Sequence, residues 1–90
     1  MSDTVMRLKE VLTHTEIFAV KAIFDVLEEE NEKIIVATRL SAEKNVAKSV
    51  MISALRLLHA VGAVKTESVG SKGTRVIVLN RDMLEAVAKL

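Results

Sequence analysis

The chain has 90 residues, of which half are hydrophobic and 28% are charged, and its formal net charge is +1. This length suits a single domain, and the composition excludes intrinsic disorder, which goes with low hydrophobicity and high net charge. Because the chain has no cysteine and only two aromatic residues, disulfides, cysteine-ligated zinc and an aromatic platform for single-stranded nucleic acid are excluded.

The N-terminal segment is predicted to be a short amphipathic helix. Val5, Leu8 and Leu12 recur at the spacing of one helical face, which predicts a linker helix over residues 1–12. The next four residues, Thr13-His-Thr-Glu16, have the pattern of a capping box. In that motif the threonine hydroxyl accepts a hydrogen bond from the backbone amide of the glutamate, and the glutamate carboxylate accepts one from that of the threonine.

A second helix is predicted from about residue 14 to 29. Its apolar stripe is Ile17, Val20, Ile23, Phe24 and Leu27. After a charged connection, the β-branched run Ile34-Ile-Val36 predicts a short strand that leads into a helix at about 37–44. Asn45 follows, and asparagine tolerates the left-handed backbone conformation that a tight turn needs.

The next helix is predicted at about 47–61 and should end at Gly62, because glycine is the preferred residue just past a helix end. Two strands are predicted at 63–69 and 74–79. Gly70-Ser-Lys-Gly73 lies between them and supplies the turn, so the two strands should form a hairpin.

A last helix is predicted at about 81–89, with Met83, Leu84, Val87 and Leu90 on its apolar side. A helix–turn–helix followed directly by a β-hairpin is the element order of a winged helix-turn-helix. The sequence therefore predicts an α+β fold that is mainly helical with a β-hairpin wing. The winged domain is expected over residues 13–90, after the linker helix at 1–12.

The two halves of the chain differ in charge. Residues 1–45 carry six basic and nine acidic groups, a net charge of −3, whereas residues 46–90 carry seven basic and three acidic groups, a net charge of +4. Such an asymmetry indicates that the second half faces a polyanion. The alternative is a chance fluctuation in solvated surface charge.

The helix at 47–61 has one apolar and one polar face. A helical wheel places the core face at Val50, Ala54, Leu57, Leu58 and Val61. The opposite side carries Lys48, Ser49, Ile52, Arg56 and His59, with Ser53 at its margin. Lysine and arginine can donate to guanine, an aliphatic side chain can meet a thymine methyl group, and serine can bond a base or a phosphate. Recognition helices read bases mostly with their N-terminal residues, which favours Lys48, Ser49 and Ile52. The alternative is an ordinary solvated helix face.

Two further groups of residues are candidates for DNA contact. Ser71 and Lys72 at the wing tip, together with Arg75, are placed to reach phosphates or an adjacent minor groove. Thr38 and Arg39 open the first helix of the motif, where contacts to backbone phosphates are common. The alternatives are that the tip glycines serve only the turn and that Arg39 is an ordinary surface residue.

These elements resemble the C-terminal DNA-binding domain of the CodY family of nutrient-sensing transcriptional repressors. The resemblance covers roughly residues 12–80. It is carried by Val36-Ala-Thr-Arg-Leu40, Lys48-Ser-Val50, Ala54-Leu-Arg56, Leu58, Gly62, Val69-Gly-Ser-Lys-Gly-Thr74 and Val78-Leu-Asn80. Thr13-His-Thr-Glu16 is similar to the family's Ser-Tyr-Ser-Glu cap, and one residue is inserted in the acidic connection.

The resemblance implies a DNA-binding role, but it does not extend to the family's sensor domain. Family members carry an N-terminal GAF domain that binds branched-chain amino acids, and they respond to GTP. No part of this chain corresponds to that sensor, so neither ligand is expected to bind here. We expect the chain to be the DNA-binding domain of a longer regulator, the other reading being a small relative that has lost the sensor.

The sequence departs from the family's pattern at four positions. Asn45 replaces the turn glycine, Ala47 replaces the threonine that caps the recognition helix, Lys48 replaces an arginine and Arg75 replaces a wing tyrosine. The loss of the capping threonine should cost about 1 kcal/mol of helix stability. Lys48 keeps the positive charge but loses the bidentate fork of arginine. The DNA sequence that this chain prefers is therefore expected to differ from the one that the family prefers.

No catalytic constellation or metal site is apparent. His14 and His59 are far apart in sequence and lack neighbours at metal-ligand spacing, so no enzyme activity, cofactor or metal is expected. No apolar run approaches the roughly 18 residues of a membrane span, and a cytoplasmic location is expected. The predicted function is sequence-specific binding of double-stranded DNA as part of a CodY-like repressor, with a homodimer expected for function. The alternative is a winged-helix module for protein interaction or dimerisation, whose exposed stripe at Val5, Leu8 and Leu12 would hold a partner helix.

Overall fold

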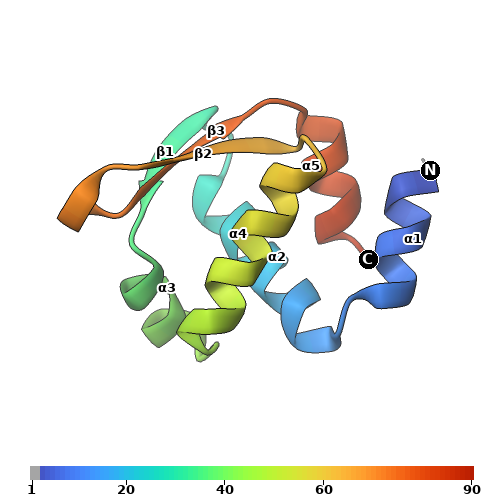
Figure 1. Ribbon diagram of the computed structural model, residues 1–90, viewed down its shortest axis with the longest axis horizontal. Helices are drawn as coiled ribbons and strands as arrows, with labels where there is room; N and C mark the ends of the chain where they lie inside the picture. The colour runs from blue at the N-terminus through green and yellow to red at the C-terminus, as the bar shows by residue number, and fades with distance from the viewer. Residues whose placement is uncertain (1–2) are drawn as a thin grey trace.

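The computed structural model describes the backbone of residues 3–90 and all side chains of that range except those at positions 4, 5 and 72. The predictions made for the Val5 and Lys72 side chains therefore lie outside the described residues. In chain order the elements are α1 (Asp3–Val11), α2 (His14–Leu27), β1 (Glu32–Ile35), α3 (Ala37–Lys44), α4 (Lys48–Ala60), β2 (Val64–Ser68), a short 3-10 turn (Gly70–Lys72), β3 (Thr74–Val78) and α5 (Arg81–Ala88) (Figure 1). The α+β class and the winged helix-turn-helix are confirmed.

The three strands form one antiparallel sheet in the order β1-β3-β2. The hairpin of β2 and β3 is the wing, and β1 adds a strand on its other side. In the register, Arg75 of β3 lies between Ile34 of β1 and Glu67 of β2. Figure 1 shows the helices gathered on one side of this sheet. The sheet therefore has an inner face that meets the helices and an outer face that no described helix covers.

The predicted boundaries hold closely, with two corrections in the segment between α2 and β1. The second helix ends at Leu27 and not at residue 29, because Glu28 leaves the helix with φ 53° and ψ −124°. The strand predicted over 34–36 begins earlier, at Glu32, because β3 pairs with it there: Glu32 lies opposite Ile77. Sequence pattern alone does not show this pairing, which draws charged residues into the strand.

The local signals at the helix ends are confirmed. The Glu16 amide donates to the Thr13 hydroxyl at 3.2 Å and the Thr13 amide donates to the Glu16 carboxylate at 3.1 Å, which closes the capping box. Asn45 is left-handed, with φ 56° and ψ 45°. At the end of α4, Gly62 has φ 76° and the Ala63 amide donates to the Leu58 carbonyl at 3.0 Å. This is the Schellman arrangement, which satisfies carbonyls that a helix end leaves unpaired.

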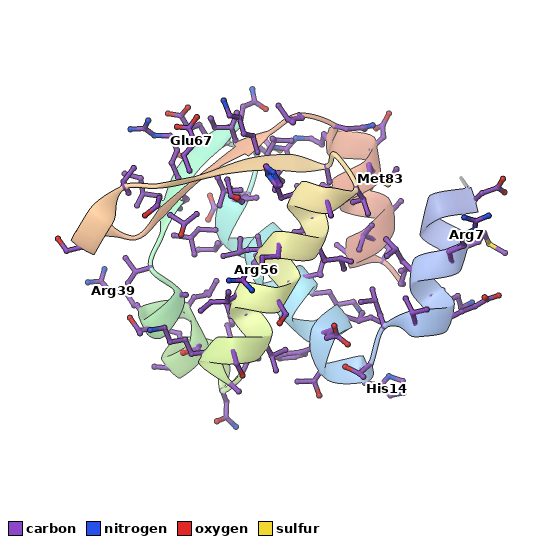
Figure 2. The ribbon with its side chains drawn as sticks, in the orientation of Figure 1. Arg7, His14, Arg39, Arg56, Glu67 and Met83 are labelled. Atoms are coloured by element: carbon purple, nitrogen blue, oxygen red, sulfur yellow. The ribbon has the colours of Figure 1, made fainter. Side chains whose placement is uncertain are left out.

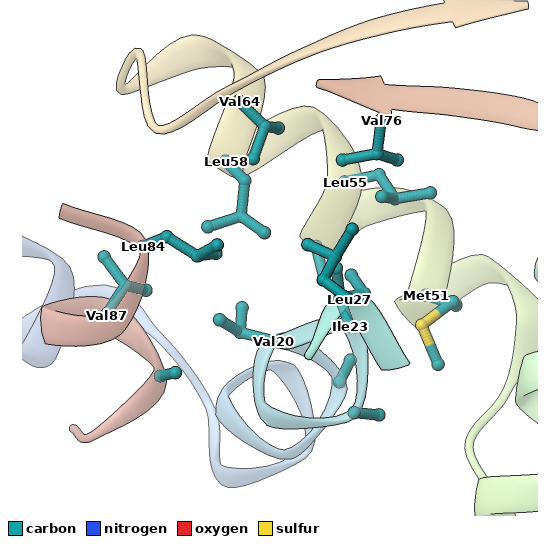
Figure 3. Packing of buried hydrophobic residues seen from close by; sticks show 14 of the residues in the cluster. Val20, Ile23, Leu27, Met51, Leu55, Leu58, Val64, Val76, Leu84 and Val87 are labelled. Carbon is teal, nitrogen blue, oxygen red and sulfur yellow. The ribbon is translucent and has the colours of Figure 1, made fainter. Parts of the chain in front are cut away.

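The core lies between α2, α4, α5 and the inner face of the sheet. Figure 3 shows the side chains of these elements pointing toward one another. The largest fully buried side chains are Val20, Ile23, Leu27, Met51, Leu58, Val64, Val76, Leu84 and Val87. Burial of this apolar surface is the main contribution that stabilises a domain of this size.

The buried face of α4 differs from the predicted one. Met51 and Leu55 are buried with Ala54 and Leu58, whereas Val50, Leu57 and Val61 are only half buried. The reason is that α4 packs against both α2 and β2, so its buried sector turns toward the sheet. A helical wheel cannot show which neighbours a helix has.

The N-terminal helix α1 packs against the rest of the fold through part of its apolar side. Leu8 is 7% exposed and Leu12 packs against the core, while α1 lies beside α5 (Figure 1). Leu8 and Leu12 therefore do not form the exposed stripe expected for a partner helix, because Leu8 is buried and Leu12 packs against the core. Within residues 3–90, no helix is long and apolar enough to span a bilayer.

Candidate nucleic-acid interface

The recognition helix begins without a side-chain cap. Ala47 is the N-cap residue of α4, with φ −58° and ψ 139°, and supplies no capping hydrogen bond. Backbone amides of the first turn therefore lack a side-chain acceptor at this end, where the helix dipole favours negative charge. Lys48 and Ser49, the first two residues of α4, are exposed there.

An open groove of about 480 Å³ runs between α4, the start of α3 and the inner face of the wing. It brings together five of the predicted contact residues from three separate elements: Thr38, Lys48, Ile52, Arg56 and Ser71. Figure 2 shows Arg56 midway along α4, beside the wing. The groove is the one place in the described structure where the start of the motif, the recognition helix and the wing tip share a surface.

The groove has a positive electrostatic character. It is lined by Lys48 and Arg56 and by no carboxylate, and neither cation forms an ion pair with a described residue. Ile52 and Leu55 supply its apolar floor. The chemistry of this surface is therefore that of an anion site with an apolar strip beside it.

Other predicted residues lie apart from the groove. Ser49 and Ser53 are exposed on α4 and are not among the residues that line the groove. Arg39, labelled at the start of α3 in Figure 2, lines a smaller hollow of about 180 Å³ together with Glu43 and Lys33. These residues adjoin the groove along the same two helices but do not line it.

Arg75 occupies the outer face of the sheet, opposite to the groove. Its guanidinium lies 3.8 Å from the Glu32 carboxylate and 3.6 Å from that of Glu67, and Lys65 lies 3.0 Å from Glu67. The hydrogen bond and the charge of Lys65, with a smaller contribution from Arg75, hold the pKa of Glu67 below its ordinary value of 4.5. The structure therefore joins Arg75 to an ion-pair network across the three strands and does not place it with the groove residues.

Three hydroxyl residues of the groove were not among the predicted contacts. Thr66, Ser68 and Thr74 line the groove from the inner face of the wing, and Ser68 lies directly opposite Thr74 in the register. They line the same groove as the two cations of α4. The signal was available, since hydroxyl residues at Thr66 and Ser68 have the two-residue period of one strand face.

Gly73 holds the wing tip close to the start of α3. Its φ is 114°, and a β-carbon at this position would lie 2.6 Å from the Ile35 carbonyl oxygen and 3.2 Å from Val36. Only glycine permits this approach. Gly73 therefore serves the turn and also permits close packing of the wing tip against the segment that enters α3.

The two histidines have separate surroundings. His14 is exposed at the start of α2. His59 is exposed near the end of α4, where its Nδ1 accepts a hydrogen bond from the Thr66 amide at 3.3 Å. Among the described residues, no group of three or more His, Cys, Asp or Glu is arranged to hold a metal ion.

Comparison with known proteins gives the family. Residues 30–89, from the end of the acidic connection through α5, match the CodY helix-turn-helix domain. The chain belongs to the CodY helix-turn-helix family.

Its relatives include several proteins called global transcriptional regulator CodY. The chain is 35% identical to the one from Lysinibacillus sphaericus, 34% to the one from Clostridium acetobutylicum and 37% to the one from Brevibacillus brevis, in each case over 79 residues. The alignment covers 88% of this chain and 30% of each of these relatives. The chain thus spans about a third of the length of the CodY proteins that it matches.

The match to the CodY helix-turn-helix domain includes the whole groove. The matched residues 30–89 contain all three of its walls, namely the start of α3, the outer side of α4 and the wing. The chain is accordingly a DNA-binding helix-turn-helix domain of the CodY transcription regulators. The departures at Asn45 and Ala47 are accommodated, since Asn45 adopts the left-handed conformation and Ala47 only leaves the cap unfilled.

Proposed function

We propose that the chain binds double-stranded DNA in a sequence-specific manner, as the DNA-binding part of a CodY-like repressor in the cytoplasm. The observation that supports this most is the groove, because it combines an exposed recognition helix, two cations without a carboxylate and a row of wing hydroxyls. DNA requires these features together: phosphates need cations and donors, and base edges need a helix that fits the major groove.

In this proposal the first half of α4 enters the major groove. Lys48 donates to guanine O6 or N7, Ser49 bonds a base or a phosphate, and Ile52 packs against a thymine methyl group. Ile52 is half buried in the apolar floor of the groove, so part of its side chain is open to a base. Arg56, one turn further on, reaches a base or the nearer phosphate.

One sugar–phosphate strand then passes between α4 and the wing. Thr66, Ser68, Thr74 and the tip residue Ser71 offer hydroxyl donors on the wing side, and Thr38 offers one at the start of α3. Such contacts position a protein on the duplex without reading its sequence. Arg39 and Ser53 adjoin this path on the two helices and are proposed to contact the flanking phosphates.

The two remaining predicted contacts belong to the wing. Lys72 lies at its tip and is proposed to reach phosphate or the adjacent minor groove. Arg75 can do so only by leaving its ion pairs with Glu32 and Glu67. Its contribution to binding is therefore expected to be smaller than that of Lys48 or Arg56.

A homodimer on DNA would double the contact surface and match a two-fold symmetric operator. The isolated domain is expected to bind weakly, with a dissociation constant on the order of 10⁻⁴–10⁻⁶ M at physiological salt. Nanomolar binding by a chain shown to be monomeric would contradict this part of the proposal.

Fluorescence anisotropy with labelled duplex DNA tests the proposal. Binding should weaken as salt rises, and Lys48→Ala with Arg56→Ala should weaken it at least tenfold. The matched control is Lys9→Ala with Lys21→Ala, which removes the same charge from exposed positions outside the groove and should change affinity little. The proposal fails if binding is independent of salt, or if both double variants weaken it equally.

A further inference from the structure

A second surface of the molecule has the character of a binding site. His14 and Phe18 lie one turn apart at the start of α2 and form an exposed ridge, which we call the Phe18 ridge. Phe18 is 51% exposed, although it is one of only two aromatic residues in the chain. We propose that the Phe18 ridge docks an acidic protein segment that carries an apolar anchor side chain.

The ridge separates two hollows. One has a volume of about 480 Å³ and lies between the ridge and the end of α1, with Leu12 and Ile17 in its lining. The other has a volume of about 350 Å³ and lies between the ridge and the turn after α3, with Val46 in its lining. Both hollows are lined by His14 and Phe18. An apolar side chain can therefore be held on either side of the phenyl ring.

The surroundings of the ridge are basic. Lys9 and Lys21 line the first hollow, together with Leu90 at the end of the given sequence, and Lys44 lines the second; no Asp or Glu side chain lines either. None of the three lysines forms an ion pair with a described residue. In this they resemble Lys48 of the groove and differ from Lys33, Lys65 and Lys89, which are paired. A ring of unpaired lysines around an exposed aromatic residue is complementary to carboxylates around an apolar side chain.

The chemistry favours a protein segment over a nucleic acid. A DNA backbone would satisfy the lysines but has no apolar group to cover Phe18, Leu12 and Ile17. The hollows also share no lining residue with the groove between α4 and the wing. An amphipathic helix with acidic residues beside its apolar stripe meets both requirements, since its anchors recur every three or four residues.

The probe for this proposal is a short synthetic helical peptide with leucine on one face and glutamate on the other. We expect saturable binding to the full chain by fluorescence anisotropy, and amide shifts in a heteronuclear NMR spectrum that centre on His14, Phe18 and Lys44. Two control peptides, one with lysine in place of glutamate and one with serine in place of leucine, should not bind. If the acidic peptide fails to bind, or binds no better than the controls, the proposal is overturned.

Variants locate the site. Phe18→Ser should weaken binding of the peptide at least about tenfold, and Lys9→Glu with Lys21→Glu should do the same and reduce the salt dependence. The matched control is Leu79→Ser, which removes another exposed apolar side chain, 60% exposed, and should leave binding unchanged. Thermal melts establish that each variant is folded. Equal binding by Phe18→Ser and wild type would refute the assignment to this ridge.

Two measurements distinguish an acidic protein segment from other occupants of the ridge. If sedimentation shows a dimer of the wild type that Phe18→Ser dissociates, the occupant is a second copy and the proposal is wrong. If unlabelled duplex DNA displaces the peptide, the surface binds nucleic acid and the proposal is also wrong. The Phe18→Ser variant should bind duplex DNA as the wild type does. Peptide binding at the ridge and DNA binding at the groove are therefore tested independently.

Discussion

Gly73 of the wing and Ile35 of β1 approach so closely that a β-carbon on Gly73 would lie 2.6 Å from the Ile35 carbonyl oxygen. Ile35 is the last residue of β1, two positions before α3 begins. The contact therefore connects the wing tip with the entry to the helix-turn-helix. Gly73 and Val36, the residue after Ile35, both line the groove.

Gly73→Ala is expected to destabilise the domain by about 1–3 kcal/mol, because it combines a backbone collision with an unfavourable positive φ. Binding of duplex DNA should weaken as well, since the wing must move. The control is Gly70→Asn: Gly70 has φ 69° and open space around it, and asparagine tolerates that conformation. Chemical denaturation of both variants measures the difference, and equal stability of Gly73→Ala and wild type would contradict the prediction.

Glu28→Gly is expected to stabilise the domain by about 1 kcal/mol. Glu28 has φ 53° and ψ −124°, a conformation that costs little for glycine and more for other residues. Its exposed side chain makes no described contact, and its carbonyl, which accepts from Arg81 at 3.1 Å, is kept. The neighbouring Glu29 has no positive φ, so Glu29→Gly should not stabilise. Denaturation midpoints that rank these two variants the other way would be inconsistent with strain at Glu28.

Ala47→Thr is expected to stabilise α4 by about 1 kcal/mol. The N-cap position has an extended ψ of 139° and no capping hydrogen bond, so a threonine hydroxyl can accept from an amide of the first turn. The matched control is Ala42→Thr inside α3, which is exposed and should lower stability slightly, because threonine is the poorer helix former. Thermal unfolding by circular dichroism measures both, and a lower midpoint for Ala47→Thr would exclude a capping role.

The wing hydroxyls and the cations of α4 are expected to differ in their response to salt. Thr66→Val with Thr74→Val should weaken duplex binding severalfold without changing the slope of affinity against salt, because neutral groups release no counterions. Lys48→Ala should lower that slope by about 1. Anisotropy titrations over a range of salt concentrations compare them. A changed slope in the threonine variant would show that the loss comes from an altered fold and not from the hydroxyls.

The ion-pair network on the outer face predicts a pH dependence at Glu67. Its pKa is lowered in the folded state, mainly by the hydrogen bond from Lys65. A lowered carboxyl pKa adds stability above the unfolded-state value and loses it as pH falls through the folded-state value. Wild type should therefore exceed Glu67→Gln slightly in thermal midpoint at neutral pH. The difference should vanish at pH values well below 4.5, and a constant difference across that range would exclude the carboxylate as its source.

Local features of this fold follow from the sequence, whereas relations between elements do not. The capping box at Thr13, the left-handed Asn45 and the helix end at Gly62 depend on neighbouring residues only, and each is confirmed. The rotated buried face of α4 and the start of β1 at Glu32 depend on which element packs beside which. Those pairings are set by the whole chain and leave no local pattern.

Only part of the candidate site could likewise be predicted from the sequence. The contact of α4 residues with the wing could be expected from the element order, and the groove brings Lys48, Ile52 and Arg56 together with Ser71. The side of the sheet on which Arg75 lies could not be predicted from the sequence. Strand alternation shows which residues share a face, but it does not show which face meets the helices. Once Val76 is known to be buried, Arg75 must point outward.

The packing of α1 against α5 has a practical consequence. The start of α1 and the end of α5 lie on the same side of the molecule, across from the wing tip (Figure 1). A fluorophore, a surface tether or a second folded module attached at either end would therefore stand clear of the groove. Such fusions can report on or localise this domain without blocking the surface by which we propose that it reads DNA.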